Sequence, residues 1–221
     1  MRRHDLLHVD PTAWREMLDH YPGLEDLPLV GDWASQGWPV IVRRRMEKEV
    51  ADGVPGALPL PPCHGKRRVG FSFSSNAGLT PMEPVLLRDA ALAAPPAWRP
   101  TISALVRLGE SFGASPRVFG SLLWEHLTEL PYLTQKSDLD LLWSVADSRS
   151  AAGLVGGLQR LDADSLFRLD GELELSDGGG VNWRELSQAA GVARDAVLVK
   201  TMNGAELRTV AELFDAAVCA S

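Results

Sequence analysis

The second half of the chain alternates between segments with helical periodicity and segments with strand periodicity. In residues 101–113, apolar side chains recur every three or four positions, which predicts an amphipathic helix with Thr101 at its start and Gly113 at its end. Such alternation is typical of an α/β or α+β domain in which helices cover a sheet. The other predicted strands are 117–119, 138–145, 167–175 and 197–200, and the other predicted helices are 121–128, 148–161, 182–190 and 205–219.

A proline-rich segment separates this half from the first. Residues 91–100, ALAAPPAWRP, hold three prolines, and proline removes a backbone donor and disfavours a helix just before it. We therefore predict two domains, a small mixed α/β N-terminal domain over residues 1–95 and a second domain over residues 96–221. In the first domain the sequence predicts a helix at 11–21, strands at 38–45 and 68–75, and a loop at 52–65.

Charge is distributed unevenly between the two halves. Residues 1–100 hold twelve basic and twelve acidic side chains, and residues 101–221 hold ten and seventeen, so the net charge of −7 arises in the second half. This balance argues against a protein that binds duplex DNA, which needs a basic face for the phosphates. The basic runs Arg43–Arg45 and Lys66–Arg68 remain as anion contacts, although solvated surface explains them as well.

Other features of the sequence predict a cytoplasmic protein. It contains no apolar run of about eighteen residues, and its first residues do not form the apolar core of a signal peptide. The cysteines, Cys63 and Cys219, lie far apart and lack the spacing of a zinc site, so we expect neither a metal nor a disulfide there.

Residues 119–143 carry the most informative side chains. Asp138 and Asp140 flank one leucine in a predicted strand, so both carboxylates project from one face, about 7 Å apart along the chain. Neighbouring carboxylates repel each other, and oxygen ligands at this spacing suit Mg²⁺ with substrate phosphates completing its shell. Gly120 admits close approach of a ligand, and Ser121 at a helix start offers a hydroxyl and amides to a phosphate. The segment therefore predicts a metal and triphosphate site.

Each of these signals also has a structural explanation. A D-x-D pair is more often a solvated strand edge, and a Gly-Ser pair is often only a turn. Arg117, before the glycine, and Lys200, at the end of an apolar strand, are candidates for neutralising phosphates, but ordinary surface charges would look the same. A non-catalytic nucleotide-binding module is thus the alternative from another functional class, although the presence of both aspartates disfavours it.

The order of Gly-Ser and D-x-D resembles the nucleotidyltransferase superfamily typified by DNA polymerase beta. The resemblance implies that Asp138 and Asp140 bind metal ions, that the Gly-Ser turn binds the triphosphate, and that a neighbouring strand supplies a third carboxylate. The segment FRLDGELEL, residues 167–175, offers Asp170, Glu172 and Glu174 on one face. We favour Glu172, because the adjacent glycine permits close approach, and leave the choice among the three open.

Segments along nearly the whole chain resemble one family more closely. RRHDLLHV, WPVIVRRR, VGFSFS, PRVFGSLLWEHLT, YLTQKSDLDLLW, LDGELEL, DGGGVNWREL and VLVKT together resemble the malonate decarboxylase holo-acyl-carrier-protein synthases, which are phosphoribosyl-dephospho-CoA transferases. The resemblance implies transfer of 2'-(5''-phosphoribosyl)-3'-dephospho-CoA from its triphosphate precursor to a serine of the apo acyl-carrier subunit, with release of pyrophosphate.

The resemblance also implies how the chain divides this work. It implies a nucleotidyltransferase-like C-terminal domain that uses Mg²⁺, with Asp138, Asp140 and Glu172 as catalytic residues, and an N-terminal domain that contacts the donor or the carrier protein. Carrier proteins of this type are generally acidic, so we expect docking on the two basic runs of the first half. Transfer of an ordinary nucleotide to another acceptor is the alternative activity, since it would use the same acidic site.

Overall fold

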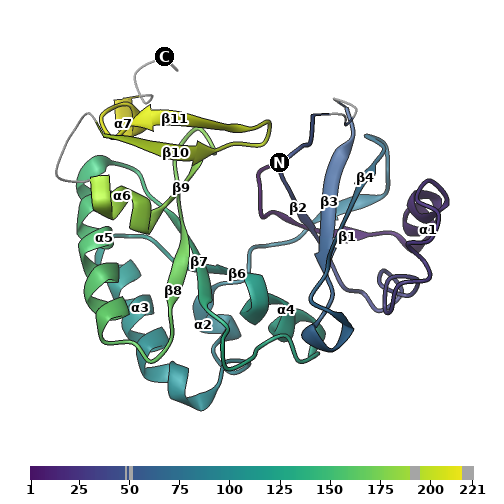
Figure 1. Cartoon of the computed structure of the whole chain (residues 1–221), viewed down its shortest axis with the longest axis horizontal. Helices are drawn as coiled ribbons and strands as arrows, with labels where there is room; N and C mark the ends of the chain where they lie inside the picture. The colour runs from purple at the N-terminus through teal and green to yellow at the C-terminus, as the bar shows by residue number, and fades with distance from the viewer. Residues whose placement is uncertain (48, 50–51, 190–194, 216–221) are drawn as a thin grey trace. The chain divides into compact units, whose positions relative to one another are not determined.

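The computed structural model of the chain shows an α+β protein that divides into two compact units (Figure 1). It describes residues 1–47, 49, 52–189 and 195–215. The first unit comprises Met1–Pro84 with residues 130–132 and 202–204, and the second comprises the other described residues. The proline-rich segment at 91–100 therefore lies within the second unit.

An antiparallel five-stranded sheet of order β4-β3-β2-β1-β5 forms the first unit. Helix α1 begins after Asp10, whose carboxylate accepts a hydrogen bond from the backbone N–H of Thr12 (2.8 Å). Its Trp14 packs edge-on against Phe71 of β4 in the core. The elements are β1 (Leu6–Val9), α1 (Pro11–Asp19), β2 (Val40–Val42), β3 (Val54–Pro59), η1 (Pro62–His64), β4 (Arg68–Phe73) and β5 (Leu79–Pro81).

The prediction of a loop at residues 52–65 was wrong, because most of these residues form β3 and the short helix η1. Only Gly56 and Ala57 of β3 pair with β2, so Pro55 and Pro59 lie outside that ladder. A proline there interrupts no β2–β3 pairing, although both prolines also lie opposite residues of β4. The prolines therefore favoured a loop prediction for a segment that forms a strand.

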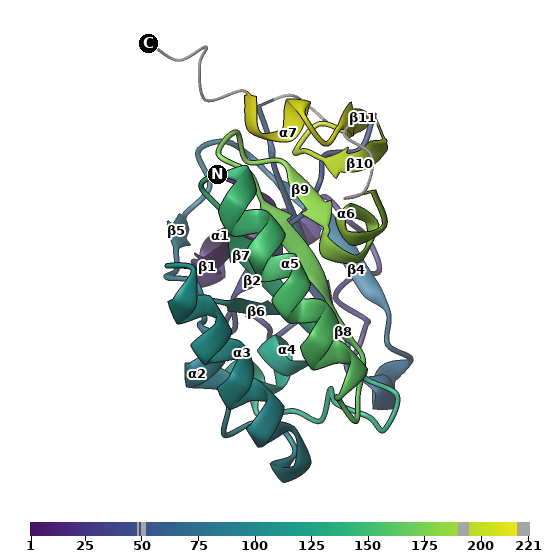
Figure 2. The same ribbon diagram turned by 90° about the vertical axis from the view of Figure 1, so that its left-hand side faces the viewer.

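The second unit is built on a six-stranded sheet of order β11-β10-β9-β8-β7-β6, in which only the pair β7 and β8 is parallel. Helices α3 and α5 lie side by side and cover one face of this sheet (Figure 2). The helices are α2 (Leu87–Ala90), η2 (Pro96–Trp98), α3 (Arg99–Ser111), α4 (Gly120–Thr128), α5 (Ser148–Ala163), α6 (Trp183–Ala189) and α7 (Glu212–Asp215). The strands are β6 (Arg117–Phe119), β7 (Leu139–Ser144), β8 (Leu169–Glu174), β9 (Gly180–Asn182), β10 (Ala196–Lys200) and β11 (Ala205–Thr209).

Two predictions for the second unit were wrong. Residues 205–209, predicted as helix, form β11, because they pair with β10 as a hairpin and its ladder outweighs their helical propensity. The other described part of that prediction contains the single turn α7, and residues 216–219 lie outside the described residues, as does Ala190 of another predicted helix. Helix α3 begins at Arg99, so Thr101 lies inside its first turn and is not its cap.

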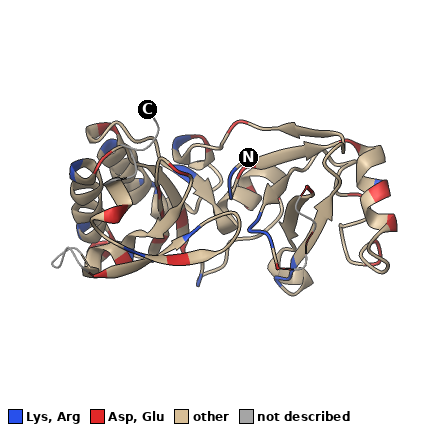
Figure 3. Cartoon of the chain, turned by 90° about the horizontal axis from the view of Figure 1, so that it is seen from above, with Lys and Arg blue, Asp and Glu red and all other residues tan. Residues whose placement is uncertain are grey.

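Strands β7 and β8 and helix α5 confirm the central part of the predicted pattern. Leu139 and Leu141 are buried, as expected for the face of β7 opposite the aspartates. Charged side chains occur on both units (Figure 3). Within the described residues, no helix has the length and apolar character needed to cross a lipid bilayer.

Candidate active site

The junction between β6 and α4 is shaped around one carboxylate. Gly120 has a φ of +67°, a backbone conformation that favours glycine. A Cβ atom built on Gly120 would lie 1.9 Å from Oδ2 of Asp140, so any side chain at this position would displace that carboxylate. We expected Gly120 to admit a ligand, and the structure shows that it first makes room for Asp140.

Three aspartates come together beside this junction. Asp138, Asp140 and Asp170 each offer a carboxylate oxygen, and these oxygens lie within 4.8 Å of one another. All three side chains are half-buried. The pairing of the strands explains the grouping, because Asp140 lies opposite Phe119 of β6 and level with Asp170 of β8. Clustered carboxylate oxygens are the ligands that Mg²⁺ and similar hard cations prefer.

Glu172, which we favoured as the third carboxylate, lies elsewhere on β8. The parallel register places it level with Leu142, two residues beyond the aspartate group. Its side chain is buried, and its Oε1 accepts a hydrogen bond from Nζ of Lys200 (2.8 Å). The neighbouring Gly171 has a structural reason of its own, since a Cβ there would lie 1.9 Å from the carbonyl oxygen of Leu141. The structure therefore brings Asp170, and not Glu172, to the pair.

Glu174, the third acid on this face of β8, is also buried and paired. Its carboxylate forms an ion pair with Arg117 and accepts a hydrogen bond from the hydroxyl of Ser144 (3.2 Å). Lys200 likewise pairs with Glu172. A buried carboxylate needs such a partner because desolvation of an unpaired charge is costly. Both cations that we predicted as phosphate contacts thus bind buried glutamates in this structure.

Ser121, the second residue of α4, lies half-buried at the start of that helix. Its hydroxyl makes no hydrogen bond with any residue that the structure describes. The preceding Phe119 has no side-chain oxygen, and no side-chain cap hydrogen bond is present at this helix start in the described part of the chain. Uncapped N–H groups at a helix start are suited to bind an anion.

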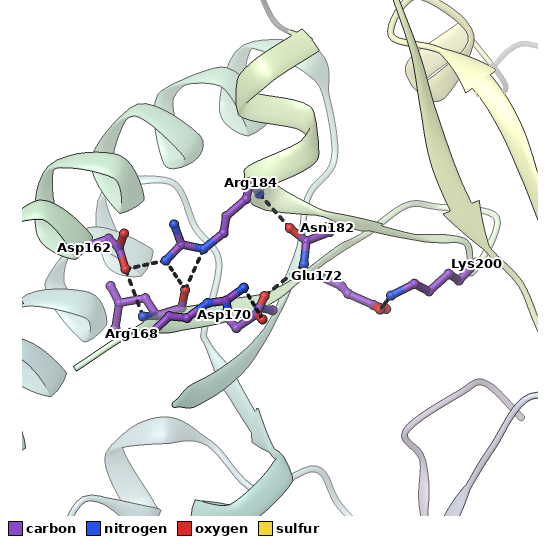
Figure 4. Close-up of polar contacts among 9 residues, drawn as sticks. Asp162, Arg168, Asp170, Glu172, Asn182, Arg184 and Lys200 are labelled. Atoms are coloured by element: carbon purple, nitrogen blue, oxygen red, sulfur yellow. Dashed lines mark hydrogen bonds and ion pairs between the residues drawn. The ribbon is translucent and has the colours of Figure 1, made fainter. Parts of the chain in front are cut away.

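A polar network holds Asp170 (Figure 4). Its Oδ1 accepts hydrogen bonds from Nδ2 of Asn182 (2.9 Å) and from the backbone N–H of Gly171 (2.8 Å). Its Oδ2 lies 3.2 Å from a guanidinium nitrogen of Arg168. Asn182 was not predicted as a site residue, and its only signal in the sequence was a polar side chain at the first position of the predicted helix 182–190.

Arg184 supports the strand that carries this aspartate. Its Nε and Nη2 donate to the carbonyl oxygen of Leu169 (3.1 and 2.7 Å), and Nη2 also pairs with Oδ1 of Asp162 (2.5 Å). The same Asp162 oxygen accepts a hydrogen bond from the backbone N–H of Leu169 (2.9 Å). The start of β8 is therefore tied through both its N–H and its carbonyl group to α5 and α6.

Fold and site together define an α+β protein with a candidate metal centre on the parallel strands β7 and β8 and on Asp138 just before β7. The family model described as the phosphoribosyl-dephospho-CoA transferase MdcG C-terminal domain matches residues 86–211, and the model of the MdcG N-terminal domain matches residues 2–77. The chain belongs to this phosphoribosyl-dephospho-CoA transferase family.

Similar proteins bear the same family name. The phosphoribosyl-dephospho-CoA transferase of Bradyrhizobium diazoefficiens is 39% identical over 188 residues, which cover 85% of this chain and 83% of that protein. The phosphoribosyl-dephospho-CoA transferase of Xanthomonas campestris pv. campestris strain 8004 is 35% identical over 212 residues, 96% of each chain. No solved structure matches the chain.

Proposed function

We propose that the chain transfers the phosphoribosyl-dephospho-CoA group from its triphosphate precursor to a serine of the apo acyl-carrier subunit of malonate decarboxylase, with release of pyrophosphate. The family assignment supports the transferred group. The observation that carries the chemistry is the group of three aspartates beside the start of α4. We further propose that the reaction takes place in the cytoplasm.

Asp138, Asp140 and Asp170 would hold the metal, for which we propose Mg²⁺. Three oxygens within 4.8 Å of one another fit a hard cation, and the repulsion among the carboxylates favours its binding. Bound there, Mg²⁺ supplies positive charge that offsets the charge of the phosphates.

The protein's own residues orient the reactants. The hydroxyl of Ser121 and the uncapped amides at the start of α4 bind the pyrophosphate portion of the donor, where the positive end of the helix dipole lies. Lys200, with 37% of its side chain exposed, balances charge on the phosphates while it neutralises Glu172. Arg117 also balances charge on the phosphates, from its more buried ion pair with Glu174.

The transfer itself is a displacement at phosphorus. The carrier serine oxygen forms a bond to the α-phosphorus, the bond from that phosphorus to the pyrophosphate oxygen breaks, and the serine proton passes to a carboxylate. Asp138, Asp140 and Glu172 are the candidates for this base. Glu172 is the weaker candidate, because it is buried and bound to Lys200, whereas Asp138 makes no hydrogen bond among the described residues.

One incubation tests the proposal against its alternatives. The chain is mixed with Mg²⁺, apo carrier protein and either the triphosphate precursor or ordinary nucleoside triphosphates, and the mass of the carrier is followed. We expect the mass of phosphoribosyl-dephospho-CoA to appear on the carrier only with the precursor, and excess chelator to prevent it. Gain of a nucleotide mass would indicate another nucleotidyltransferase, and binding of the precursor without any transfer would indicate a binding module.

A further inference from the structure

Asn182 is held from both ends of its side-chain amide. It is the last residue of β9, and its Oδ1 accepts the backbone N–H of Arg184 (2.9 Å) at the start of α6. Its Nδ2 donates to Oδ1 of Asp170 (2.9 Å), as Figure 4 shows. A backbone N–H can only donate, so Oδ1 must face Arg184 and the NH₂ group must face the aspartate. The helix cap therefore sets the orientation of the amide.

The contacts of Asp170 divide unequally between its two oxygens. Oδ1 accepts from Asn182 and from the backbone N–H of Gly171, whereas Arg168 is the only donor to Oδ2 among the residues that the structure describes. The Arg168 side chain is 62% exposed, and an exposed ion pair contributes little. Asp138, by contrast, has no hydrogen-bond partner among the described residues. Asp170 is thus oriented mainly through one oxygen.

We propose that Asn182 is a positioning residue for the acidic site, which keeps the carboxylate of Asp170 beside those of Asp138 and Asp140. Without a metal the three carboxylates repel, so Asp170 would rotate away unless a donor holds it. A neutral amide does this without adding a positive charge that would compete with a cation. The inference rests on the proposed metal-dependent function and assigns to it a residue outside the aspartate group.

The test measures binding of Mn²⁺ to the full chain by electron paramagnetic resonance, so that no turnover is needed. Asn182→Ser keeps an oxygen that caps α6, but its shorter side chain cannot place a donor at Asp170. We expect its dissociation constant for Mn²⁺ to rise on the order of tenfold, with an almost unchanged melting temperature. Asn182→Ala should weaken Mn²⁺ binding equally and also lower the melting temperature, because it removes the cap.

A double-mutant cycle decides whether Asn182 acts through Asp170. In an Asp170→Ala background, which removes the acceptor of the Asn182 amide, the further change Asn182→Ser should leave Mn²⁺ binding unchanged. If Asn182→Ser weakened Mn²⁺ binding equally in both backgrounds, or bound Mn²⁺ like the wild type, the proposed role of Asn182 would be overturned. The proposed metal centre would still stand. Failure of the wild-type chain to bind Mn²⁺ would overturn the metal centre as well. If Asn182→Ser folds poorly, Asn182→Thr serves in its place, since it also caps the helix without reaching the aspartate.

Discussion

At the scale of single residues, the site combines acids with different surroundings. Asp138 has no hydrogen-bond partner among the described residues, whereas Asp170 is bound on both oxygens. Glu172 and Glu174, on the same strand, are buried and paired with cations. The half-buried aspartates are therefore suited to a ligand, and the glutamates to holding Lys200 and Arg117.

We expect Asp138→Asn and Asp140→Asn each to reduce transfer more than about a hundredfold. The fold should survive, because removal of one charge from a clustered acidic group relieves repulsion in the metal-free protein. Transfer rate and melting temperature are the measurements, and Asp164→Asn, at an exposed carboxylate, is the matched control. A wild-type transfer rate in either folded variant would contradict the assignment of the active site.

Substitution of Arg168 tests whether its positive charge weakens or strengthens metal binding by the three aspartates. Because its guanidinium contacts Oδ2 of Asp170, it would compete for that oxygen with a metal held at the proposed site. We expect Arg168→Gln to tighten Mn²⁺ binding about twofold to threefold, a small effect because the pair is exposed, and the difference should shrink with added salt. Arg107→Gln, at another exposed arginine, is the control. Weaker binding by Arg168→Gln would mean that the arginine supports the site instead.

At the scale of elements, pairing between strands decides which side chains meet. The crossover through α5 makes β7 and β8 parallel, and their register sets Asp140 level with Asp170. A shift of two residues would bring Glu172 to the same level. In the first unit, the side chain of Arg43 links three strands. Arg43 follows β2 and donates to the carbonyl groups of Gly56 on β3 and Phe71 on β4.

The ion pair between Arg43 and Glu49 makes the first unit sensitive to acid. The hydrogen bond from Arg43 lowers the pKa of Glu49 from 4.5 to about 2. The pair therefore stabilises the folded state fully above pH 4.5, and this stabilisation is lost as the pH falls toward 2. We expect Glu49→Gln to lower the free energy of unfolding by at most about 3 kcal/mol at pH 6 and by less at pH 3.

Denaturant unfolding at the two pH values measures this difference. Glu47→Gln, at an exposed glutamate close by in the sequence, is the control and should follow the wild type at both. A gap between Glu49→Gln and the wild type that stays constant from pH 6 to pH 3 would contradict the linkage to this pair.

At the scale of the whole molecule, the two basic runs of the first unit differ in what they offer a partner. Arg43 is only 20% exposed and is bound to Glu49, so it serves the fold, and Arg44 is the exposed arginine of that run. Lys66, Arg67 and Arg68 are all exposed and make no ion pair with the described residues. An acidic carrier protein would therefore find free positive charge at the second run.

We expect reversal of Lys66, Arg67 and Arg68 to Glu to raise the KM for the carrier about threefold to tenfold at low salt. Saturation by the donor and metal dependence should not change, and the effect should fall as salt is added. The matched control reverses Arg107, Arg149 and Arg160, three exposed arginines of the second unit, for the same change in charge. Normal transfer at limiting carrier by the first variant would place docking elsewhere.

Local spacing was enough to predict part of this site. The alternation of side chains along a strand put Asp138 and Asp140 on one face, and the helix that starts at Gly120 followed from its local pattern. These features depend mainly on neighbours in the sequence, and here the tertiary structure kept them.

The tertiary structure decided the rest. The third carboxylate depends on the register of β7 with β8, which no local pattern of 167–175 specifies. Asn182 reaches Asp170 only because β9 pairs with β8, and residues 205–209 become a strand only because β10 offers them a ladder. Each of these contacts joins segments whose own sequences allow several pairings. The contacts therefore stabilise one pairing over the others only once the sheet has formed.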